Sequence, residues 1–323
     1  MTTLNKHKKI SSKLIYENNN LKDIHLSIVI PTFQRPQYLR QALLSIDCLD
    51  FSFLYEVVVV DNDIKSSDIT MNILSEFQNL PLRLFSNESN IGMIGNWNRC
   101  LELASGEYIT ILNDDDLLLD GWPEYVAREK KNKELIGCSF KRFIEFEKDN
   151  LLIKCKTKKY STLKPLNIKS FFLGLWTNGS LGTIFHRDSC INLGGFNEDI
   201  FPISDWDFYV RYFCSYGGYI TNLKLTGFRW EVNESLNPET IKKYITSNEK
   251  FRNQMIKKGY FERKSLYKFL TLIIKIKMVF YARKKNACIK EEELSPYLKD
   301  IPSHYLILRY LPMKIIRILT KFF

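Results

Sequence analysis

From about residue 26 to residue 112, short apolar runs alternate with segments whose apolar residues recur at helical spacing. The run EVVVV at residues 56–60 is continuous and β-branched, which is typical of a parallel strand covered on both faces. Strands are expected at residues 26–30, 56–60, 82–85 and 108–112, and helices at about 36–46, 69–77 and 92–104. This alternation predicts an α/β fold, a mostly parallel sheet flanked by helices with right-handed connections.

The rest of the chain is less regular. Residues 140–175 are basic, with a hairpin expected near residues 148–150, and residues 204–213 read as an apolar helix that follows a Gly-Gly turn. Apolar residues broken by lysines recur at residues 269–281 and again from residue 312. We therefore expect a flexible lead at residues 1–25, a main domain at residues 26–236 and a helical, basic extension at residues 237–323.

The net charge of +11 is concentrated in the C-terminal part of the chain. Residues 241–323 contain 20 Lys and Arg against 6 Asp and Glu, whereas residues 1–240 contain 27 against 30. No apolar stretch reaches the roughly 20 residues of a membrane-spanning helix, and the polar N-terminus lacks the apolar core of a signal peptide. Seven cysteines without metal-site spacing fit a reducing cytoplasm.

The basic C-terminal segments are amphipathic when drawn as helices. From residue 312, Lys314, Arg317 and Lys321 fall on one side and apolar residues fall on the other. Such a helix suits an anionic membrane surface, which predicts a cytoplasmic protein peripheral on the inner face of the cytoplasmic membrane. The alternative is a helical cap that packs its apolar side onto the protein. No nucleic-acid partner is expected, because no nucleic-acid-binding module accompanies the basic residues.

The polar run Asn113-Asp114-Asp115-Asp116 directly follows the apolar run at residues 108–112. Carboxylates crowded at the end of a buried strand repel one another and lose hydration, so they seldom stabilise a fold. A divalent cation removes both costs, because hard oxygen ligands suit Mg²⁺ or Mn²⁺, and such ions in turn hold phosphates. The alternative is a solvated turn in which Asp116 caps the next helix.

Two other predicted strands also end in polar residues, Thr32 after the first and Asp61-Asn62-Asp63 after the second. Ligands bind beyond the carboxyl ends of such strands, so these side chains are expected to meet at one edge of the sheet. Neither G-x-G-x-x-G after the first strand nor G-x-x-x-x-G-K-[ST] occurs. Dinucleotide-dependent dehydrogenases and P-loop NTPases are therefore poor fits, and any phosphates would be held by a metal ion.

Four segments resemble family 2 glycosyltransferases of the GT-A fold: SIVIPTFQRPQYLRQAL, VVVVDND, SNIGMIGNWNRCLELASGEYITILNDDD and GGFNEDIFPISDWDFYVR. They occur in the family's order and at its usual intervals between about residues 26 and 230. The resemblance implies a Rossmann-like GT-A domain at residues 26–236. It also implies inverting transfer of a sugar from a nucleotide-sugar, with a UDP-sugar as the expected donor and Mg²⁺ or Mn²⁺ as cofactor.

The resemblance further implies roles for individual residues. Asp61 matches the carboxylate that binds the base, Asp115 matches the metal ligand of the D-x-D motif, and Asp205 matches the general base. The implied nucleotide-sugar-binding residues are Pro31, Thr32, Phe33, Arg35, Asp61, Asp63, Gly92 and Asp114. The metal side is assigned to Asp115 and Asp116, and the acceptor side to Gly195, Phe196, Trp206 and Asp207. The alternatives are that Asp205 only caps a helix and that the Gly pair only forms a turn.

Three positions depart from the family pattern. Asn113 replaces the first acid of D-x-D, although its amide oxygen can still accept a hydrogen bond. Ser204 replaces the acid before Asp205, which removes a neighbouring charge and alters the environment of the expected base. Many relatives carry a His after the aromatic-Arg pair, where this chain has Trp230 and then Glu231, and whether Glu231 replaces that ligand stays open.

The expected function is transfer of a sugar to a glycan or to a polyprenyl-diphosphate-linked glycan in bacterial surface polysaccharide synthesis. One alternative is a non-catalytic scaffold that binds nucleotide or glycan. The other is a sugar-1-phosphate nucleotidyltransferase, whose usual Gly-rich loop is absent from residues 31–35.

Overall fold

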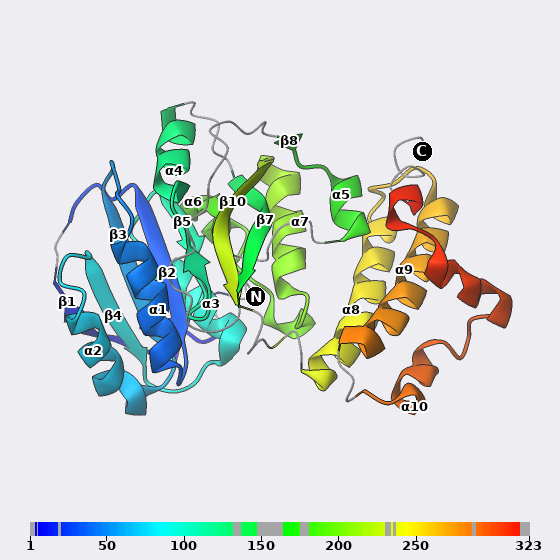
Figure 1. The fold of residues 1–323 in the computed structure, drawn as a ribbon, viewed down its shortest axis with the longest axis horizontal. Coiled ribbons are helices and arrows are strands. Elements are labelled where there is room, and N and C mark those ends of the chain that lie inside the picture. Colours follow the sequence, from blue (N-terminus) through cyan, green and yellow to red (C-terminus); the bar gives the residue numbers. More distant parts are fainter. Residues whose placement is uncertain are drawn as a thin grey trace. The chain divides into compact units, whose positions relative to one another are not determined.

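The computed structural model describes residues 4, 6–18, 21–131, 137–146, 164–174, 181–229, 234, 237–285 and 289–316 (Figure 1). The chain divides into two compact units. The first comprises residues 1–167, 176–198 and 208–231, and the second comprises residues 168–175, 199–207 and 232–323. The second unit thus combines the C-terminal part of the chain with two short segments of the predicted main domain.

The first unit is built on a ten-stranded sheet in the order β1-β4-β3-β2-β5-β9-β7-β10-β6, with β8 paired to β10. The strands are β1 Ser12–Glu17, β2 Leu26–Thr32, β3 Tyr55–Asp61, β4 Leu82–Asn87, β5 Tyr108–Ile111, β6 Leu117–Leu118, β7 Gly137–Phe146, β8 Lys164–Pro165, β9 Ile184–His186 and β10 Tyr219–Arg229. Strands β4, β3, β2 and β5 form a parallel block, and β1 and β9 join its two sides in antiparallel fashion. The predicted α/β fold with a mostly parallel sheet is confirmed.

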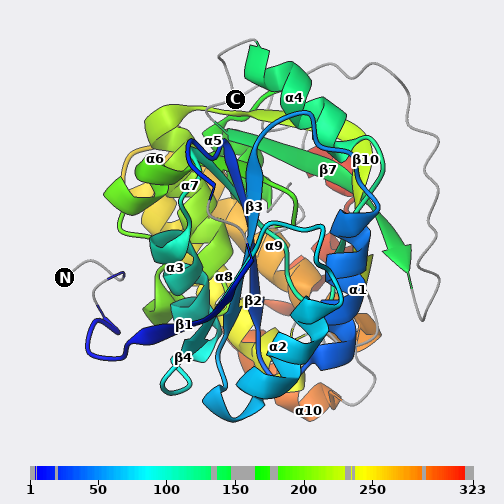
Figure 2. The same cartoon turned by 90° about the vertical axis from the view of Figure 1, so that its left-hand side faces the viewer.

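Helices cover both faces of this sheet (Figure 2). Helices α1 Pro36–Asp47 and α2 Ser67–Ser75 lie on one face, and α3 Gly92–Leu103 and α6 Arg187–Asn192 lie on the other. The chain moves outward from β2 to β4 and then returns to β5 on the far side of β2. Right-handed connections therefore place α3 on the face opposite α1 and α2. The 3₁₀ turn η2 Ile64–Ser66 precedes α2, and α4 Trp122–Lys131 follows β6.

The core of the first unit follows the apolar pattern of the sequence. Residues 57–60 of β3 are fully buried, as a strand covered on both faces requires. Helix α1 starts with Pro36 in its first turn, where a missing N–H costs nothing. It buries the residues that recur at helical spacing, namely Leu39, Ala42, Leu43 and Ile46.

The lead at residues 1–25 differs from expectation. It contains β1, which pairs with β4 in antiparallel register so that Ser12 lies opposite Asn87. The residues of β1 are half-buried or exposed, so no continuous apolar run marks the strand in the sequence. The hairpin expected near residues 148–150 lies outside the described residues.

The second unit is helical where it is described. Its elements are α5 Ile168–Leu173, α8 Pro238–Lys257, α9 Lys264–Lys285, α10 Glu291–Leu294, η5 Ser295–Tyr297 and η6 Ser303–Tyr310. The boundary between the units falls within two further elements, η3 Glu198–Ile200 and α7 Ser204–Tyr216. The side chain of Asn237 caps α8 by accepting from the N–H of Glu239 at 2.9 Å. A small apolar cluster joins α8, α9 and α10: Ile241, Ile245, Val279, Ala282, Ile289 and Leu294.

The lysines of α9 pair within the second unit. Lys275 Nζ lies 2.9 Å from a carboxylate oxygen of Glu249 on α8, and Lys277 Nζ donates to the carbonyl of Arg309 at 2.8 Å. Desolvation lowers the pKa of Lys277. Helix α9 therefore packs within the second unit. The amphipathic segment expected from residue 312 extends past the described residues, which end at residue 316. Among the helices that the structure describes, none has the length and apolar character that crossing a bilayer demands.

A buried carboxylate joins the amino ends of the central strands. Glu56 of β3 is 2% exposed, and its oxygens accept from Ser27 Oγ at 2.6 Å, Ser105 N at 2.7 Å and Arg83 Nη1 at 2.9 Å. Gly106 closes this turn, because a Cβ there would lie 2.6 Å from the backbone nitrogen of Ser27. The cluster therefore fixes how the turn before β5 packs on β2 and β3.

Replacing Glu56 with Ala should lower the free energy of unfolding by about 3 kcal/mol, because the buried partners lose their acceptor. Glu17→Ala is the matched control, since the exposed Glu17 carboxylate pairs with the same Arg83 at 3.5 Å. That variant should cost at most about 1 kcal/mol. Urea unfolding of both variants measures the difference, and equal losses would contradict a special role for the buried carboxylate.

Candidate active site

The carboxyl ends of β2, β3 and β5 meet at one edge of the sheet. Thr32 at the end of β2 lies opposite Asp61 at the end of β3, and Asn62 N donates to the carbonyl of Thr32 at 2.9 Å. Leu112 N donates to the carbonyl of Val29 at 2.9 Å, so the chain leaves β5 alongside β2. The structure thus brings together the three strand ends that the sequence predicts to converge.

The first two aspartates of the acidic run are tied to the loop after β2. Thr32 Oγ1 donates to Asp114 Oδ2 at 2.8 Å. Arg35 Nη1 lies 3.0 Å from Asp115 Oδ2 and 3.4 Å from Asp114 Oδ1. The two aspartates are only 5% and 8% exposed. Two buried carboxylates therefore share one partly exposed guanidinium, that of Arg35.

Burial raises the pKa values of these carboxyl groups. Desolvation and the charge of Asp115 raise the pKa of Asp114 to about 6, although Arg35 and Thr32 oppose the shift. Desolvation likewise raises the pKa of Asp115, against the charges of Arg35 and Arg229. Such shifts show that the ionised pair is poorly compensated, which is the condition that a cation would relieve.

Asp116 is held differently from its two neighbours. Its Oδ1 accepts from the backbone N of Arg229 at 3.1 Å, and its Oδ2 accepts from Asn113 Nδ2 at 3.0 Å. Arg229 Nε donates to the carbonyl of Asp115 at 3.1 Å, and its guanidinium lies 4.7 Å from the ring centre of Tyr38. Asp116 thus anchors the acidic turn to β10. Desolvation, then the charge of Asp115, raises its pKa well above the usual value.

Asp116 is neither a helix cap nor a solvated residue, since β6 follows it and α4 begins only at Trp122. Its predicted role as a metal ligand stays a prediction. Each of its two carboxylate oxygens already accepts a hydrogen bond from the protein. The resemblance includes Arg229 in its aromatic-Arg pair but gives it no role, and its contacts with the buried turn depend on the packing of β10. Trp230 and Glu231, which follow it, lie outside the described residues.

Asp114 and Asp115 fit a cation whose coordination is completed by a phosphate group. No group of three His, Cys, Asp or Glu side chains in the described part of the chain could enclose a metal ion by itself. Mg²⁺ is usually bound through one or two carboxylates together with substrate phosphates, so a full protein cage is not needed. Asp115, assisted by Asp114, is the residue that would hold such an ion.

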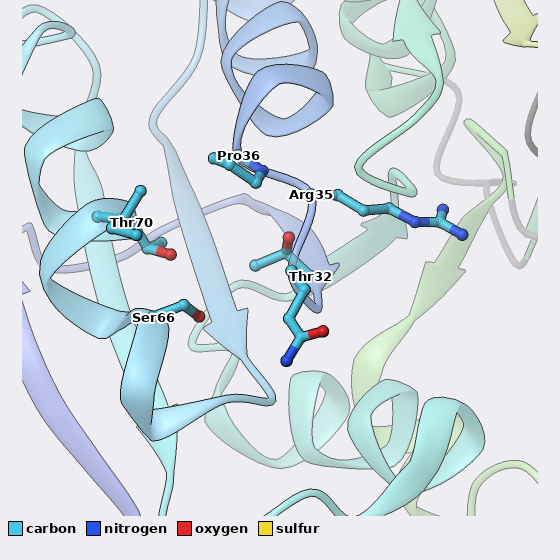
Figure 3. A pocket seen from close by; sticks show the side chains of 7 residues that line it. Thr32, Arg35, Pro36, Ser66 and Thr70 are labelled. Carbon is cyan, nitrogen blue, oxygen red and sulfur yellow. The ribbon is translucent and has the colours of Figure 1, made fainter.

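A pocket lies beside Asp61, at the end of β3. Asp61 Oδ1 accepts from Asp63 N at 3.0 Å, and its Oδ2 accepts from Ser66 Oγ at 3.0 Å and Thr70 Oγ1 at 2.6 Å. Burial raises the pKa of Asp61 despite these hydrogen bonds. Figure 3 shows Ser66 and Thr70 facing Thr32 across the pocket. The pocket is lined by Thr32, Gln34, Arg35, Pro36, Ser66, Ile69 and Thr70.

The loop after β2 is held in an unusual backbone conformation. Gln34 has φ +55°, a region that residues other than glycine seldom adopt, and its Nε2 donates to Asp63 Oδ2 at 2.8 Å. That hydrogen bond lowers the pKa of Asp63, and it links the loops after β2 and β3. Phe33 is exposed, whereas Pro31 is buried within β2. The resemblance did not identify Gln34, Ser66 or Thr70, because their roles depend on contacts between loops.

A network of buried amides positions the start of α3 against the end of β3. Asn62 Oδ1 accepts from Asn87 Nδ2 at 2.9 Å, and Asn87 Nδ2 also donates to Asn96 Oδ1 at 2.9 Å. Asn62 Nδ2 donates to the carbonyl of Gly92 at 3.3 Å. Gly92 itself has φ +77°, which explains a glycine at this helix start. Its predicted contact with the nucleotide-sugar stays a prediction.

The turn expected on the acceptor side is anchored to α3. Asn98 Oδ1 accepts from Phe196 N at 2.7 Å, and Asn98 Nδ2 donates to the carbonyl of Phe196 at 2.9 Å. Gly195 has φ +72°, and a Cβ there would lie 2.4 Å from Asn98 Oδ1. The Phe196 ring is fully buried, with its centre 4.2 Å from that of Phe208. Phe196 therefore holds the turn from within the core, and its acceptor role stays a prediction.

Asp205 and its neighbours belong to the second unit. Asp205 lies in the first turn of α7, which begins at Ser204, so it does not occupy the N-cap position. It is half-buried, its Oδ1 accepts from Trp206 N at 2.7 Å, and burial raises its pKa to about 6. Trp206 is buried and donates from Nε1 to the carbonyl of Phe171 at 3.1 Å, whereas Asp207 is half-buried.

Comparisons with known proteins agree with the fold. The profile of Glycosyl transferase family 2 matches residues 27–194. A GalNAc(5)-diNAcBac-PP-undecaprenol beta-1,3-glucosyltransferase of Campylobacter jejuni is 41% identical over 99 residues, or 30% of this chain and 31% of the relative. The amylovoran biosynthesis glycosyltransferase AmsB of Erwinia amylovora is 24% identical over 202 residues, which cover 59% of this chain and 64% of AmsB. The chain thus spans less than two thirds of either relative.

Solved structures share the fold at low sequence identity. S. aureus TarS superposes with a TM-score of 0.59 at 16% identity, covering 89% of this chain and 53% of TarS. The mannosyltransferase PcManGT of Pyrobaculum calidifontis, solved with GDP-Man and Mn²⁺, superposes with a TM-score of 0.54 at 15% identity. The match covers 95% of this chain and 91% of PcManGT. The fold is therefore that of the GT-A glycosyltransferases. Because the family profile matches more than half of its residues, the chain belongs to glycosyl transferase family 2.

Proposed function

We propose that this protein is an inverting, metal-dependent glycosyltransferase that moves a sugar from a UDP-sugar to a glycan or a lipid-linked glycan of a surface polysaccharide. The observation that carries the proposal is the edge at which β2, β3 and β5 end. There, Asp61 is hydrogen-bonded to Ser66 and Thr70, two residues that line the pocket, and Asp114 and Asp115 share one guanidinium.

The hydrogen bonds of Asp61 favour uracil as the base of the donor. A carboxylate has about four lone-pair positions. Two donors occupy Oδ2 and one occupies Oδ1, which leaves a single position on Oδ1. The imide N–H of uracil needs one acceptor, whereas the adjacent N–H and NH₂ of guanine need two. A UDP-sugar donor is also consistent with the structure of a TarS fragment solved in complex with UDP.

The diphosphate of the donor needs positive charge as it leaves. A divalent ion supplies Lewis-acid compensation for that charge when it is bound. Asp115 and Asp114 would hold the ion, and Arg35 adds a fixed cation beside them. The PcManGT structure with Mn²⁺ is consistent with this use of the fold.

Asp205 is the proposed general base, which takes the proton of the acceptor hydroxyl as that oxygen attacks the sugar. A base works best when its pKa lies near the working pH, and burial brings the pKa of Asp205 to about 6. A single displacement by the acceptor oxygen inverts the configuration at the sugar carbon.

The acceptor is proposed to be a glycan, free or linked to a polyprenyl diphosphate. The Campylobacter jejuni relative is named for a PP-undecaprenol-linked acceptor, which supports this class. A non-catalytic scaffold remains the alternative of a different kind. Release of UDP from UDP-glucose or UDP-GlcNAc in the presence of Mn²⁺ separates the two, because a scaffold would release none.

An anionic membrane is the proposed surface partner, through η6 of the second unit. Ile307 and Tyr310 are each 69% exposed on η6, and Arg309 lies between them in the chain. Lys314 is also exposed shortly after η6. Exposed apolar residues beside cations suit the interface of an anionic bilayer.

Replacing Asp115 with Ala should weaken Mn²⁺-dependent binding of UDP about tenfold or more, because the proposed ion loses its carboxylate. Isothermal titration with UDP, with and without Mn²⁺, measures the effect. The matched variant is Asp116→Asn, which keeps an oxygen for the Arg229 N–H. It should retain the Mn²⁺ dependence. Loss of that dependence in Asp116→Asn alone would move the ligand role to Asp116.

Replacing Asp205 with Asn should reduce turnover at least a hundredfold and leave the affinity for UDP unchanged, because the general base is lost. In the unsubstituted protein, turnover should rise with pH through about 6 and level off above it, since the base acts when deprotonated. Initial rates of UDP release across pH 5–9 test both expectations. Asp199→Asn, an exposed acid of the same segment, is the control. Unchanged turnover in Asp205→Asn would remove the residue from this role.

The double variant Ile307→Glu and Tyr310→Glu should reduce binding to vesicles that contain phosphatidylglycerol by about tenfold or more, because it replaces apolar contacts with charges that the bilayer repels. Vesicle cosedimentation measures the binding. Leu54→Glu, on an exposed apolar residue of the first unit, is the control. Equal binding of all three proteins would exclude η6 as the membrane contact.

A further inference from the structure

Residues 6–12, which we call the N-terminal strap, lie against helix α3. Arg99 of α3 is only 8% exposed, and its Nη2 donates to the carbonyl of His7 at 3.1 Å and to that of Ile10 at 2.9 Å. Its Nη1 donates to Ser12 Oγ. One buried guanidinium thus binds the strap at three residues. The strap lies before residue 27, where the match to the family profile begins, so the family motifs do not account for it.

Two glycines make room for this end of the chain. Gly95 lies inside α3, where glycine weakens a helix. A Cβ there would lie 3.0 Å from Cδ2 and from Nε2 of the His7 ring. A Cβ at Gly195 would lie 2.8 Å from Cδ2 of Leu4, which comes shortly before the strap. The imidazole therefore packs on α3, and Leu4 packs on the turn expected on the acceptor side.

His7 also binds the residue that follows this turn. Its Nε2 lies 3.0 Å from both carboxylate oxygens of Glu198, and it carries the hydrogen, because an ionised carboxylate only accepts. The two side chains are 22% and 14% exposed, whereas Lys6, 3.4 Å from the same carboxylate, is 45% exposed. Water therefore screens the His7 pair less than the Lys6 pair. Glu198 is the last residue of the first unit before the segment 199–207, which carries Asp205.

The other end of the strap is tied to the amide network beside Asp61. Ser12 Oγ donates to Asn87 Oδ1 at 2.6 Å, and Asn87 Nδ2 donates to Asn62 Oδ1 at 2.9 Å. Asn62 directly follows Asp61, the residue expected to bind the base of the donor. The strap thus runs from the donor side of the site to the turn on the acceptor side.

The contacts of the strap are suited to fixing a position more than to burying apolar surface. Its side chains are mostly exposed and polar, namely Lys6, Lys8, Lys9 and Ser11. A hydrogen bond adds little net stability but has a defined length and direction. Several such bonds to one helix therefore hold the strap in a single register, and the strap in turn holds the groups that it touches.

We propose that His7 is a positioning residue for the acceptor side of the active site, and that it acts by holding Glu198 next to the turn that contains Gly195. The inference rests on the proposed function, in which this turn borders the acceptor and Asp205 is the general base. A tie at Glu198 fixes the start of the segment that carries Asp205. Small displacements of a reacting group lower the rate of the chemical step steeply. Other residues are assigned to the nucleotide-sugar, so its affinity does not depend on this tie.

The test uses the full chain with Mn²⁺ and whichever of UDP-glucose, UDP-GlcNAc or GDP-mannose gives the fastest nucleotide release. His7→Ala and Glu198→Ala should each lower kcat about tenfold and leave the KM for the nucleotide-sugar unchanged. The double variant should lose no more than either single variant, because the two side chains act as one unit. His7→Gln, whose amide nitrogen can replace Nε2 as a donor, should recover most of the loss. Lys6→Ala, which removes the exposed partner of the same carboxylate, should stay within about twofold of the unsubstituted protein.

Hydrogen–deuterium exchange tests the structural half of the inference. The peptide that covers residues 193–198 should exchange faster in His7→Ala than in Lys6→Ala, because the turn loses its tie. Faster exchange with unchanged kcat would show that the tie serves the structure alone, and it would overturn the positioning role.

The failures of the two proposals can be told apart. An unsubstituted protein that releases no nucleotide would overturn the proposed function, and this inference with it. Release by the unsubstituted protein, together with unchanged kcat in His7→Ala, would overturn the inference alone. So would a loss of about a hundredfold in the double variant, since it would show two independent effects. If Glu198→Ala does not fold, the comparison of His7→Ala with His7→Gln decides the question.

Discussion

The site depends on the cost of burying ionised carboxylates at the end of β5. Asp114 illustrates the size of that cost, because desolvation, followed by the charge of Asp115, raises its pKa from 3.8 to about 6, which corresponds to about 3 kcal/mol against the ionised folded state. The sign is opposite to that of a carboxylate in a good ion pair. This cost is fully present above about pH 6, where the folded protein holds the charge, and it disappears below about pH 4. A cation brought by a diphosphate would offset this cost. Relief of the cost would then contribute to the free energy of binding of that ligand.

The two arginines near the acidic run divide the task of supporting it. Arg229 is buried. Its backbone N donates to the carboxylate of Asp116 and its Nε donates to the carbonyl of Asp115, so it fixes the direction in which the aspartates leave β5. Arg35 is partly exposed and touches the carboxylates themselves. A single, partly exposed guanidinium offsets the desolvation of the two carboxylates incompletely, which is why the pKa values of Asp114 and Asp115 remain raised. Rigid support from one arginine and incomplete neutralisation by the other are both what a cation site requires.

The sequence predicts the parallel block and its polar strand ends because those features are local. Continuous β-branched runs mark β2 and β3, and a buried parallel strand must place its next polar residues at the same edge. The hydrogen bonds of Asp61 with Ser66 and Thr70, and the Asn62 network, depend on contacts between loops and could not be read from the chain. Strand β1 escaped prediction because it is half exposed and its register is set by β4. Phe196 and Trp206 are both buried, and their acceptor-side roles, which come from the motif, stay predictions.

The placement of Asp205 shows why a motif alone describes this protein incompletely. The segment around it packs with α5 and with α8, which lies more than thirty residues further along the chain. Periodicity suggested that the C-terminal helices form a separate basic extension. Within the second unit, α8 packs the Arg252 guanidinium against Trp206, the residue next to Asp205, and the lysines of α9 pair inside the same unit.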